Sequence, residues 1–481
     1  MAVGIGIVLS VCALLFSYDV YRDVSHVYAY YAREIACGNF AEGWVGRVPM
    51  LQILMAGGIS ALGINAYVAN IFISSLFYVC TLFPLRSYLQ RYLTPLQAAW
   101  GCVLFVTAPK LIRFSVSGLI DSSRYFFLIV SLLYLFRLVE KRDWKDCLLL
   151  GLGLAGLSVS RGECVVLAPL FLMLIPVLAC LTQHLNLKEI IRKYSLITLL
   201  SSVVWLAGIF PFCAVNYHYS GVFITDVRLA EAFCPWVRVN EPSEKAAVSW
   251  GDSAMDALND SMRGGYELYL LLGVLGIILL IHRRKWRWDY SLFIFIYLLH
   301  LGIYFKIVSA YRYSIYLIPL LMPFTVTGIA WLIEKYRSWQ IPRRYIWCNY
   351  AAVGVVSALL VFQVINGMRC VTDRDDVWKR KIAGVMKEWG EKNVPDRRLR
   401  VVGVDLSEAV FWSGAYNLFN YKDGKSDLRT VRDFDLMLIP LERVPEIAER
   451  NDLEPIELPE DRGFCLFRRI TVGKGTNTNG K

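Results

Sequence analysis

The first polar stretch of the chain contains two adjacent charged residues, Arg22 and Asp23, a few residues after an apolar opening segment over residues 1–16. A run with apolar residues at helical spacing follows over 24–36 and stops at Gly38. A carboxylate held at the start of a helix is well placed to act as a general base. The same position also suits a structural role, because Asp is a favoured N-cap residue and Gly a favoured helix end. Asp23 is therefore a candidate catalytic residue and a candidate helix cap.

Further charged residues stand within a residue or two of apolar segments. Placing one charge at membrane depth costs at least ~2.5–3.5 kcal/mol on insertion scales, so a ring of charges on one side indicates a polar cavity. The alternative for each residue is snorkelling to the membrane surface or pairing there. The set comprises Asp19, Arg22, Asp23, Lys110, Arg113, Asp121, Arg124, Arg161, Glu163, Lys306 and Arg312.

The composition indicates an integral membrane protein. Hydrophobic residues make up 56% of the 481 residues and the mean hydropathy is +0.45, whereas soluble domains hold roughly 45–50% apolar residues. Apolar runs close to the ~20 residues of a membrane span recur along the chain, and they predict an α-helical polytopic protein of about eleven transmembrane helices. The candidate spans are 2–18, 66–85, 96–109, 122–138, 146–160, 164–182, 196–217, 266–282, 289–305, 310–333 and 346–367. The segment 49–64 is short and rich in glycine, and it is interpreted as a re-entrant or interfacial helix.

The charge distribution predicts the orientation of these spans. With the N-terminus in the cytoplasm, the cytoplasmic turns are 86–95, 137–146, 183–195, 282–290 and 334–345. Together they hold 17 Lys and Arg against 6 Asp and Glu, as the positive-inside rule expects. The net charge of +11 therefore reports orientation and gives no sign of nucleic-acid binding.

The chain divides into a membrane domain and a smaller external domain. The membrane domain covers 1–367, with a first external loop over 19–64 and a long external loop over 218–263. Beyond it, the mixed-charge region 368–472 is predicted to be a small α/β domain, and 473–481 a disordered tail. Its predicted strands are 399–405, 434–440 and 464–468, and its predicted helices are 376–392 and 442–450.

Four stretches of sequence resemble elements of one family of membrane enzymes. The first is the pattern Arg22-Asp23-x4-Tyr28-x3-Ala32-x2-Ile35-x2-Gly38-Asn39-Phe40, followed by Arg47-Val48-Pro49 and an apolar Gly-rich helix. The others are SVSGLID at 115–121, GLGLAGLSVSRGE at 151–163, with Gly162 where proline is common, and YRYSIYLIP at 311–319. In this order they resemble the GT-C membrane glycosyltransferases, above all the protein-mannosyltransferase-like branch that includes bacterial aminoarabinose transferases. The resemblance covers most of 1–367 and only the general layout of the remainder.

The resemblance implies an inverting transfer of a sugar from a polyprenyl-phosphate donor to a glycan, lipid or protein acceptor. The implied place is the outer face of a bacterial plasma membrane, and no metal or other cofactor is implied. Asp23 would be the general base that takes the proton of the acceptor hydroxyl. Many members have Asp-Glu where Asp23-Val24 stands here, so Asp19, four residues earlier, is a competing candidate.

The leaving group of this reaction is a phosphate, which needs cations where its charge develops. The resemblance implies Arg161 and Arg312 as its main ligands, since the arginine fork binds phosphate oxygens bidentately. The implied supporting residues are Lys110, Arg113 and Lys306 as further cations, Asp121 and Glu163 as groups that orient the arginines or bind sugar hydroxyls, and Tyr28 as a further substrate contact.

Other chemistry has little support in the sequence. The five histidines lack the spacing of metal ligands, and no P-loop is present. The stretch 151–156 (GLGLAG) resembles a dinucleotide fingerprint but lies within a predicted span, where it is interpreted as a close-packing face. Two other functions stay open at this point: a transporter or lipid flippase, and an O-antigen ligase or polymerase.

Overall fold

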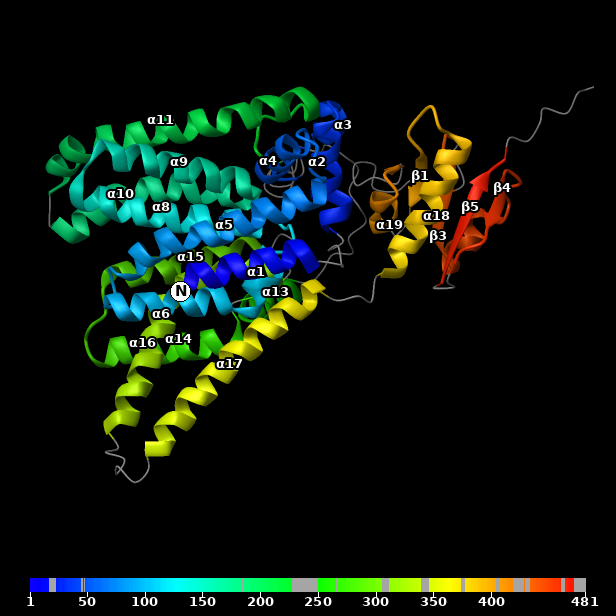
Figure 1. Cartoon of the computed structure of the whole chain (residues 1–481). Helices are drawn as coiled ribbons and strands as arrows, with labels where there is room; N and C mark the ends of the chain where they lie inside the picture. Colours follow the sequence, from blue (N-terminus) through cyan, green and yellow to red (C-terminus); the bar gives the residue numbers. More distant parts are fainter. Residues whose placement is uncertain are drawn as a thin grey trace, which may run out of the picture. The chain divides into compact units, whose positions relative to one another are not determined.

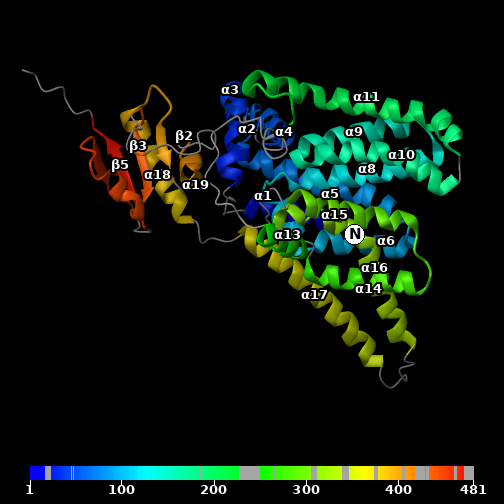
Figure 2. The ribbon, with the colours of Figure 1, turned by 180° about the vertical axis from the view of Figure 1, so that it is seen from behind.

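The chain forms two compact units in a computed structural model. Met1–Ser17 with Tyr31–Val371 form the first, called the membrane unit below, and Tyr18–Tyr30 with Thr372–Lys481 form the second, called the C-terminal unit. Figures 1 and 2 show the ribbon from opposite sides. The structure describes residues 1–16, 23–44, 46, 48–183, 186–226, 250–264, 266–304, 311–338, 346–372, 377–403, 407–417, 428, 433–459 and 463–470.

The membrane unit is built almost wholly of helices. They are α1 (Ala2–Phe16), α2 (Ala29–Ala36), α3 (Phe40–Gly43), α4 (Met50–Ser60), α5 (Ala66–Leu89), α6 (Pro95–Thr107), α7 (Pro109–Ser115), α8 (Asp121–Lys141), α9 (Trp144–Ser160), η2 (Gly162–Val166), α10 (Leu167–Gln183), α11 (Leu187–Ser220), α13 (Trp250–Gly264), α14 (Glu267–His282), α15 (Trp288–Tyr304), η3 (Tyr311–Ser314), α16 (Leu317–Ser338) and α17 (Ile346–Thr372). Each predicted span overlaps a helix, and the glycine-rich segment 49–64 contains the short helix α4.

The predicted polytopic membrane fold is confirmed in its class. Within the described residues, five helices are long and apolar enough to cross a membrane: α5, α8, α10 with the end of η2, α11 and α16. The pair α6 and α7, bent by 59°, adds a sixth if it forms one span. Five further apolar helical stretches of 10–17 described residues lie in α1, α4, α14, α15 and α17. The total of eleven spans therefore stays a prediction.

Glycines let neighbouring helices of this unit approach closely. Helices α8, α9 and α11 run side by side in both views (Figures 1 and 2). A Cβ added at Gly151 would lie 2.6 Å from Val204 of α11, and one added at Gly156 would lie 2.3 Å from Phe127 of α8. The stretch 151–156 is thus a close-packing face, as predicted, since a side chain at either glycine would overlap a residue of the neighbouring helix.

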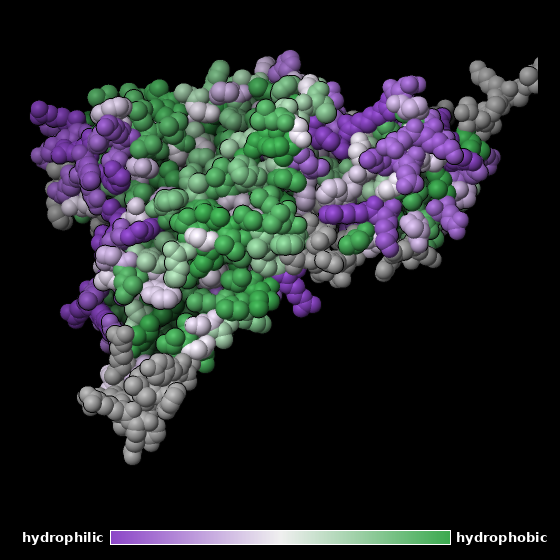
Figure 3. Space-filling model, in the orientation of Figure 1, coloured by the Kyte–Doolittle hydropathy of each residue, from purple (hydrophilic) through white to green (hydrophobic). Residues whose placement is uncertain are grey.

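The five turns that were predicted to share one membrane side lie together at one end of the unit. They are joined by contacts of Arg91 with Glu140 (2.6 Å), Arg287 with the Arg91 carbonyl (3.4 Å), Arg283 with Glu334 (3.5 Å) and Gln183 with the Val139 carbonyl (2.7 Å). In Figure 3, hydrophilic residues lie at the left edge of this unit, and a broad hydrophobic surface covers the part next to them. This end is called the basic end below. Which side of the membrane it faces stays a prediction.

The C-terminal unit contains a mixed five-stranded sheet in the order β2-β1-β3-β5-β4. The strands are β1 (Arg400–Gly403), β2 (Tyr416–Asn417), β3 (Leu436–Pro440), β4 (Leu453–Ile456) and β5 (Phe464–Arg469). Strand β1 is parallel to β2 and β3, whereas β5 is antiparallel to β3 and β4. The helical elements are η1 (Val24–Tyr28), α18 (Val377–Asn393), α19 (Ser407–Trp412) and η5 (Leu441–Ile447).

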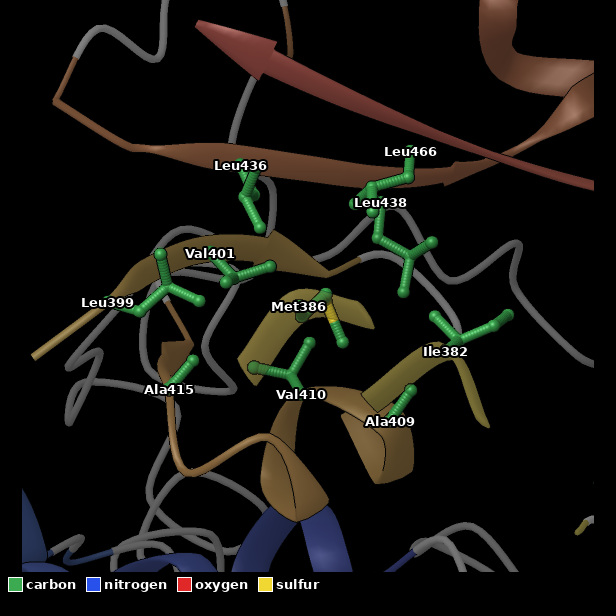
Figure 4. Packing of buried hydrophobic residues seen from close by; sticks show 10 residues of the cluster. All are labelled: Ile382, Met386, Leu399, Val401, Ala409, Val410, Ala415, Leu436, Leu438 and Leu466. Atoms are coloured by element: carbon green, nitrogen blue, oxygen red, sulfur yellow. The ribbon is translucent and has the colours of Figure 1, made fainter. Parts of the chain in front are cut away.

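Alternation along the strands gives this sheet two buried faces. Leu436 and Leu438 of β3 point to one face, where they meet Ile382 and Met386 of α18 (Figure 4). The intervening Met437 belongs to a second core on the other face. Residues two apart in a strand share a face, and residues four apart in a helix do the same, so both elements supply continuous apolar surfaces.

Three of the five strands were predicted. Strands β1 (RVVG), β3 (LMLIP) and β5 (FCLFRR) each contain consecutive apolar residues, whereas β2 has two residues and β4 (LEPI) contains a glutamate and a proline. The predicted helix 442–450 is wrong in type, because its segment forms the 3₁₀ helix η5 with Pro445 inside it. Proline lacks the N–H that an α-helix would use there.

Candidate functional site

The segment that carries Asp23 is helical from Asp23 to Ala36. It begins as the single π-helical turn η1 and continues as α2. Its end at Gly38 is as predicted: φ there is +82°, and Asn39 donates its N–H to the Glu34 carbonyl at 2.9 Å. A positive φ is natural for glycine and closes the last turn.

The predicted capping role of Asp23 is wrong. Its backbone is helical (φ −66°, ψ −26°), and its side chain caps none of the described N–H groups of η1. A capping residue normally leaves the helical region so that its side chain can turn back to the first N–H groups. Helix capping is therefore not the role of this carboxylate among the described residues.

Asp23 and Tyr28 belong to the C-terminal unit. Element η1 packs against α19, and the Tyr28 side chain is buried. One-turn π-helical segments occur often at functional sites. Asp19, the competing candidate base, lies outside the described residues.

In the membrane unit, a buried ion pair joins two of the predicted site residues. Arg161 follows α9 with an extended backbone (φ −154°), which leads the chain into η2. Its Nη1 lies 3.4 Å from Oδ1 of Asp121, and the two side chains are only 6% and 1% exposed. Asp121 begins α8, where the positive end of the helix dipole favours a carboxylate. The sequence thus predicted two residues, 40 positions apart, that the fold brings together.

Tyr313 links a second predicted arginine to this pair. The guanidinium carbon of Arg161 lies 4.3 Å from the centroid of the Tyr313 ring, and that of Arg312 lies 5.0 Å from it. Arg124 donates Nη1 to the Tyr313 carbonyl at 2.7 Å, and its guanidinium stacks on the Tyr316 ring at 3.7 Å. Cations over aromatic faces attract the ring electrons, so the tyrosines hold three buried arginines together.

His300 of α15 fixes the chain that carries these tyrosines. Its Nε2 lies 2.8 Å from the Ser314 hydroxyl, and its Nδ1 lies 2.9 Å from the Tyr316 hydroxyl. The imidazole is buried, and both ring nitrogens are therefore occupied by hydroxyl partners. Sequence reasoning missed His300 and Tyr316, because their partners depend on how α15 meets η3 and α16.

Gly162 stands where proline is common in the resembled family, and the structure shows why glycine suits this position. A Cβ added at Gly162 would lie 2.3 Å from Cβ of Asp226, a buried residue. A proline at 162 would collide with Asp226 in the same way. Glycine here therefore lets a second carboxylate approach the backbone next to Arg161.

Two of the remaining predicted residues belong to α7. Lys110 of α7 lies 3.2 Å from Glu267 at the start of α14, and the Arg113 guanidinium lies 5.4 Å from the Phe114 ring. Glu163 lies in η2, where only its backbone is described, and Lys306 lies outside the described residues.

The cluster around Tyr313 is suited to bind an anion. Of the described side chains, Arg124, Arg161 and Arg312 supply three positive charges, and the carboxylates of Asp121 and Asp226 supply two negative ones. These residues lie opposite the basic end, since α8 begins at Asp121 and α9 ends at Ser160, whereas their other ends meet the basic turns. Arginine forks in a buried setting bind phosphate more strongly than in water. Among the described residues, no three His, Cys, Asp or Glu side chains are grouped to hold a metal ion.

Two solved structures show the fold of the chain. The aminoarabinose transferase ArnT from Cupriavidus metallidurans, bound to undecaprenyl phosphate, matches with a TM-score of 0.62 at 12% identity over 98% of both chains. The oligosaccharyltransferase of Archaeoglobus fulgidus, in complex with Zn and sulfate, matches with a TM-score of 0.58 at 12% identity over 92% of this chain and 68% of that one. Both are GT-C class enzymes, so the predicted resemblance is confirmed for the fold. The sequence matches no family model and no curated protein.

Proposed function

We propose that this multi-pass membrane protein is a GT-C class glycosyltransferase that takes its sugar from a polyprenyl-phosphate donor. The observation that carries the proposal is the cluster of three buried arginines around Tyr313 and Tyr316. The cluster lies at the end of the membrane unit opposite the basic end. The fold of the chain matches, over 98% of its length, a transferase bound to undecaprenyl phosphate. The lipid tail of such a donor would remain in the bilayer, and its phosphate would lie at the arginines.

Arg161 and Arg312 are the proposed phosphate ligands. Both guanidinium groups are held by Tyr313, and Arg161 is also held by Asp121. Positioned cations stabilise the charge that develops on a leaving phosphate without having to reorganise during the reaction. Lys110, Arg113 and Lys306 are proposed as supporting cations for the donor, and Glu163 as a residue that orients the arginines.

Asp23 is the proposed general base, and Tyr28 a contact to substrate in the same segment. The carboxylate would take the proton of the acceptor hydroxyl as that hydroxyl attacks the anomeric carbon. A single displacement of this kind inverts the anomeric configuration and requires no metal ion. Asp19 is the alternative base.

The proposed topology has eleven spans with the N-terminus and the basic end in the cytoplasm. The Tyr313 cluster and the C-terminal unit would then lie on the outer side of a bacterial plasma membrane. The basic turns support this orientation, because cytoplasmic loops carry an excess of Lys and Arg. The acceptor would be a glycan, a lipid or a protein at that surface.

Transfer by purified protein in lipid, supplied with radiolabelled polyprenyl-phosphate sugars and membrane extracts as acceptor, tests the proposal. A positioned base is worth roughly 10²–10⁴ in rate, so Asp23→Asn should lower turnover by this factor and leave donor affinity unchanged. Asp143→Asn is a matched control, since Asp143 caps α9 near the basic end and Asn caps equally well.

The outcomes separate the candidate roles. Equal turnover of wild type and Asp23→Asn would exclude Asp23 as the base, and loss of turnover in Asp19→Asn alone would assign that role to Asp19. If the labelled lipid moved across the bilayer and no sugar were transferred or released from any donor, the proposed glycosyltransferase activity would be contradicted. A lipid flippase would then be favoured.

A further inference from the structure

Buried polar atoms without partners gather at the turn between α7 and α8. Gln52 of α4 donates its Nε2 to the Gly118 carbonyl at 2.9 Å. Its Oε1, the hydroxyls of Ser117 and Ser122 and Oδ2 of Asp121 are buried and have no hydrogen-bond partner among the described residues. Gln52, Ser117, Asp121 and Ser122 are called the Gln52 cluster below; each residue is less than one-tenth exposed.

Four such atoms in one place call for an explanation. Buried polar side chains nearly always have a hydrogen-bond partner, because leaving one unpaired costs free energy. The atoms come from two segments, since Gln52 belongs to α4 and the others to residues 117–122. The hydrogen bond from Gln52 to Gly118 holds these segments together. A local irregularity of one helix therefore does not account for them.

The chemistry of these atoms selects their ligand. The unpaired amide oxygen of Gln52 can only accept a hydrogen bond, and an ionised carboxylate such as Asp121 also only accepts. The hydroxyls of Ser117 and Ser122 can donate or accept. Such a set matches groups that bring their own O–H or N–H, and it repels phosphate oxygens, which are acceptors.

The neighbouring arginines have the opposite preference. Guanidinium groups donate only, and Arg161 is joined directly to Asp121 of the Gln52 cluster at 3.4 Å. One side of this ion pair therefore offers donors for a phosphate, and the other side offers acceptors for hydroxyls. A sugar phosphate has both kinds of group within a single molecule.

We propose that the Gln52 cluster is the subsite for the transferred sugar, which it recognises through the ring hydroxyls, and that Gln52 and Ser122 are specificity-determining residues. The inference rests on the proposed function, since it assigns the sugar end of the proposed donor. The ligand is a sugar that presents hydrogen-bond donors, either hydroxyls or an amine. Asp121 is already paired with Arg161, and this favours uncharged hydroxyls over an ammonium group.

Two serines of α8 give a matched comparison. Ser122 and Ser131 are both fully buried, and neither hydroxyl has a partner among the described residues. Ser131 lies nine residues further along α8, about 13 Å away at the rise of an α-helix, where it faces Gly153. Alanine at either position removes an unpaired hydroxyl from a helix and should leave folding intact.

The experiment measures binding to the full-length protein in nanodiscs. The probes are polyprenyl phosphate alone and polyprenyl phosphate carrying glucose, mannose or an amino-pentose, followed by single-deoxy forms of the tightest binder. Ser122→Ala should weaken binding of that sugar lipid about fivefold to tenfold, the worth of one hydrogen bond, and leave polyprenyl phosphate unchanged. Gln52→Leu should likewise weaken binding of the sugar lipid alone. Ser131→Ala should change the affinity for neither lipid.

Each result decides a different point. The subsite would be overturned if Ser122→Ala and Gln52→Leu weakened the binding of polyprenyl phosphate and of the sugar lipid equally, or weakened neither. Either result would leave the proposed function standing. Wild-type protein that binds neither polyprenyl phosphate nor any sugar lipid would overturn the proposed function and the subsite with it. Tightest binding of the amino-pentose, lost in Ser122→Ala, would support the subsite and identify an amine as the recognised donor.

Discussion

The ring of Tyr313 offers the sharpest test of how the arginines are held. In Tyr313→Leu the side chain keeps an apolar body but loses its aromatic face, so the contacts to Arg161 (4.3 Å) and Arg312 (5.0 Å) both disappear. Tyr313→Phe keeps both contacts and removes only the hydroxyl, which Arg312 approaches at a marginal 3.5 Å. The two variants therefore separate the ring face from the hydroxyl.

The magnitude follows from the two contacts. A cation–π contact contributes ~0.5–1 kcal/mol at an exposed site and ~2 kcal/mol when the cation is desolvated, as both buried guanidiniums are here. Losing two such contacts removes roughly 2–4 kcal/mol from the cluster. Arg161 keeps its ion pair with Asp121, so only part of this loss should reach the donor. We expect about 1–3 kcal/mol, which is roughly a 5- to 150-fold loss of donor affinity.

The assay is the affinity for polyprenyl phosphate together with kcat/KM for the labelled donor. Tyr313→Leu should lower both, whereas Tyr313→Phe should remain within about twofold of wild type, since exposed or marginal hydrogen bonds contribute little. The comparison of the two variants shows whether the ring face or the hydroxyl of Tyr313 holds the arginines. Equal damage by Phe and Leu, in proteins that unfold at the same temperature as wild type, would refute the role of the ring face.

Three further predictions concern packing and charge. Gly162→Ala should destabilise the membrane unit by about 1–3 kcal/mol, because the new Cβ meets Asp226 at 2.3 Å; a thermal unfolding midpoint equal to wild type would contradict this, and Asp226→Gly should relieve the clash. Met386→Ala should destabilise the C-terminal unit by about 2–5 kcal/mol, since the side chain is fully buried between sheet and helix, and hydrogen exchange of β3 measures the loss. The hydrogen bond from Arg450 holds the pKa of Asp452 below its usual value, so this carboxylate stabilises the folded state above its unfolded pKa of about 3.9, and the contribution is lost as pH falls through the lowered folded pKa. Hydrogen exchange of the β4 and β5 amides, measured as the pH is lowered, reports the stability of this unit. In Asp452→Asn this stability should fall less steeply with decreasing pH than in wild type. Equal pH dependence in the two proteins would contradict the role of Asp452.

The sequence predicted what depends on local pattern. Apolar runs located a helix at each of the eleven candidate spans, and the charges of the turns predicted that Arg91, Glu140 and Arg283 would share one end of the unit. Both signals arise because lipid excludes charge over a known length of chain. The motifs also selected Arg161 and Asp121, which form a buried pair.

What the sequence missed depends on how distant helices meet. Tyr313 contacts Arg124 across 189 positions, and Gln52 contacts Gly118 across 66. A polar residue within an apolar run gives no sign of its partner, because the pattern reports which face is buried and not what lies opposite. Strand β4 was missed for a different reason: its pairing with β5 supplies the stability that its own residues lack.

The allocation of Tyr18–Tyr30 to the C-terminal unit has a consequence for how the protein can be divided. The chain passes from one unit to the other three times, after Ser17, after Tyr30 and after Val371. The second passage falls inside the helical segment from Asp23 to Ala36. A protein that ends at Val371 would therefore retain Asp23 but lack α19, the element on which η1 packs. Neither unit is a removable module, and during synthesis η1 must wait for some 380 further residues before its packing partner exists.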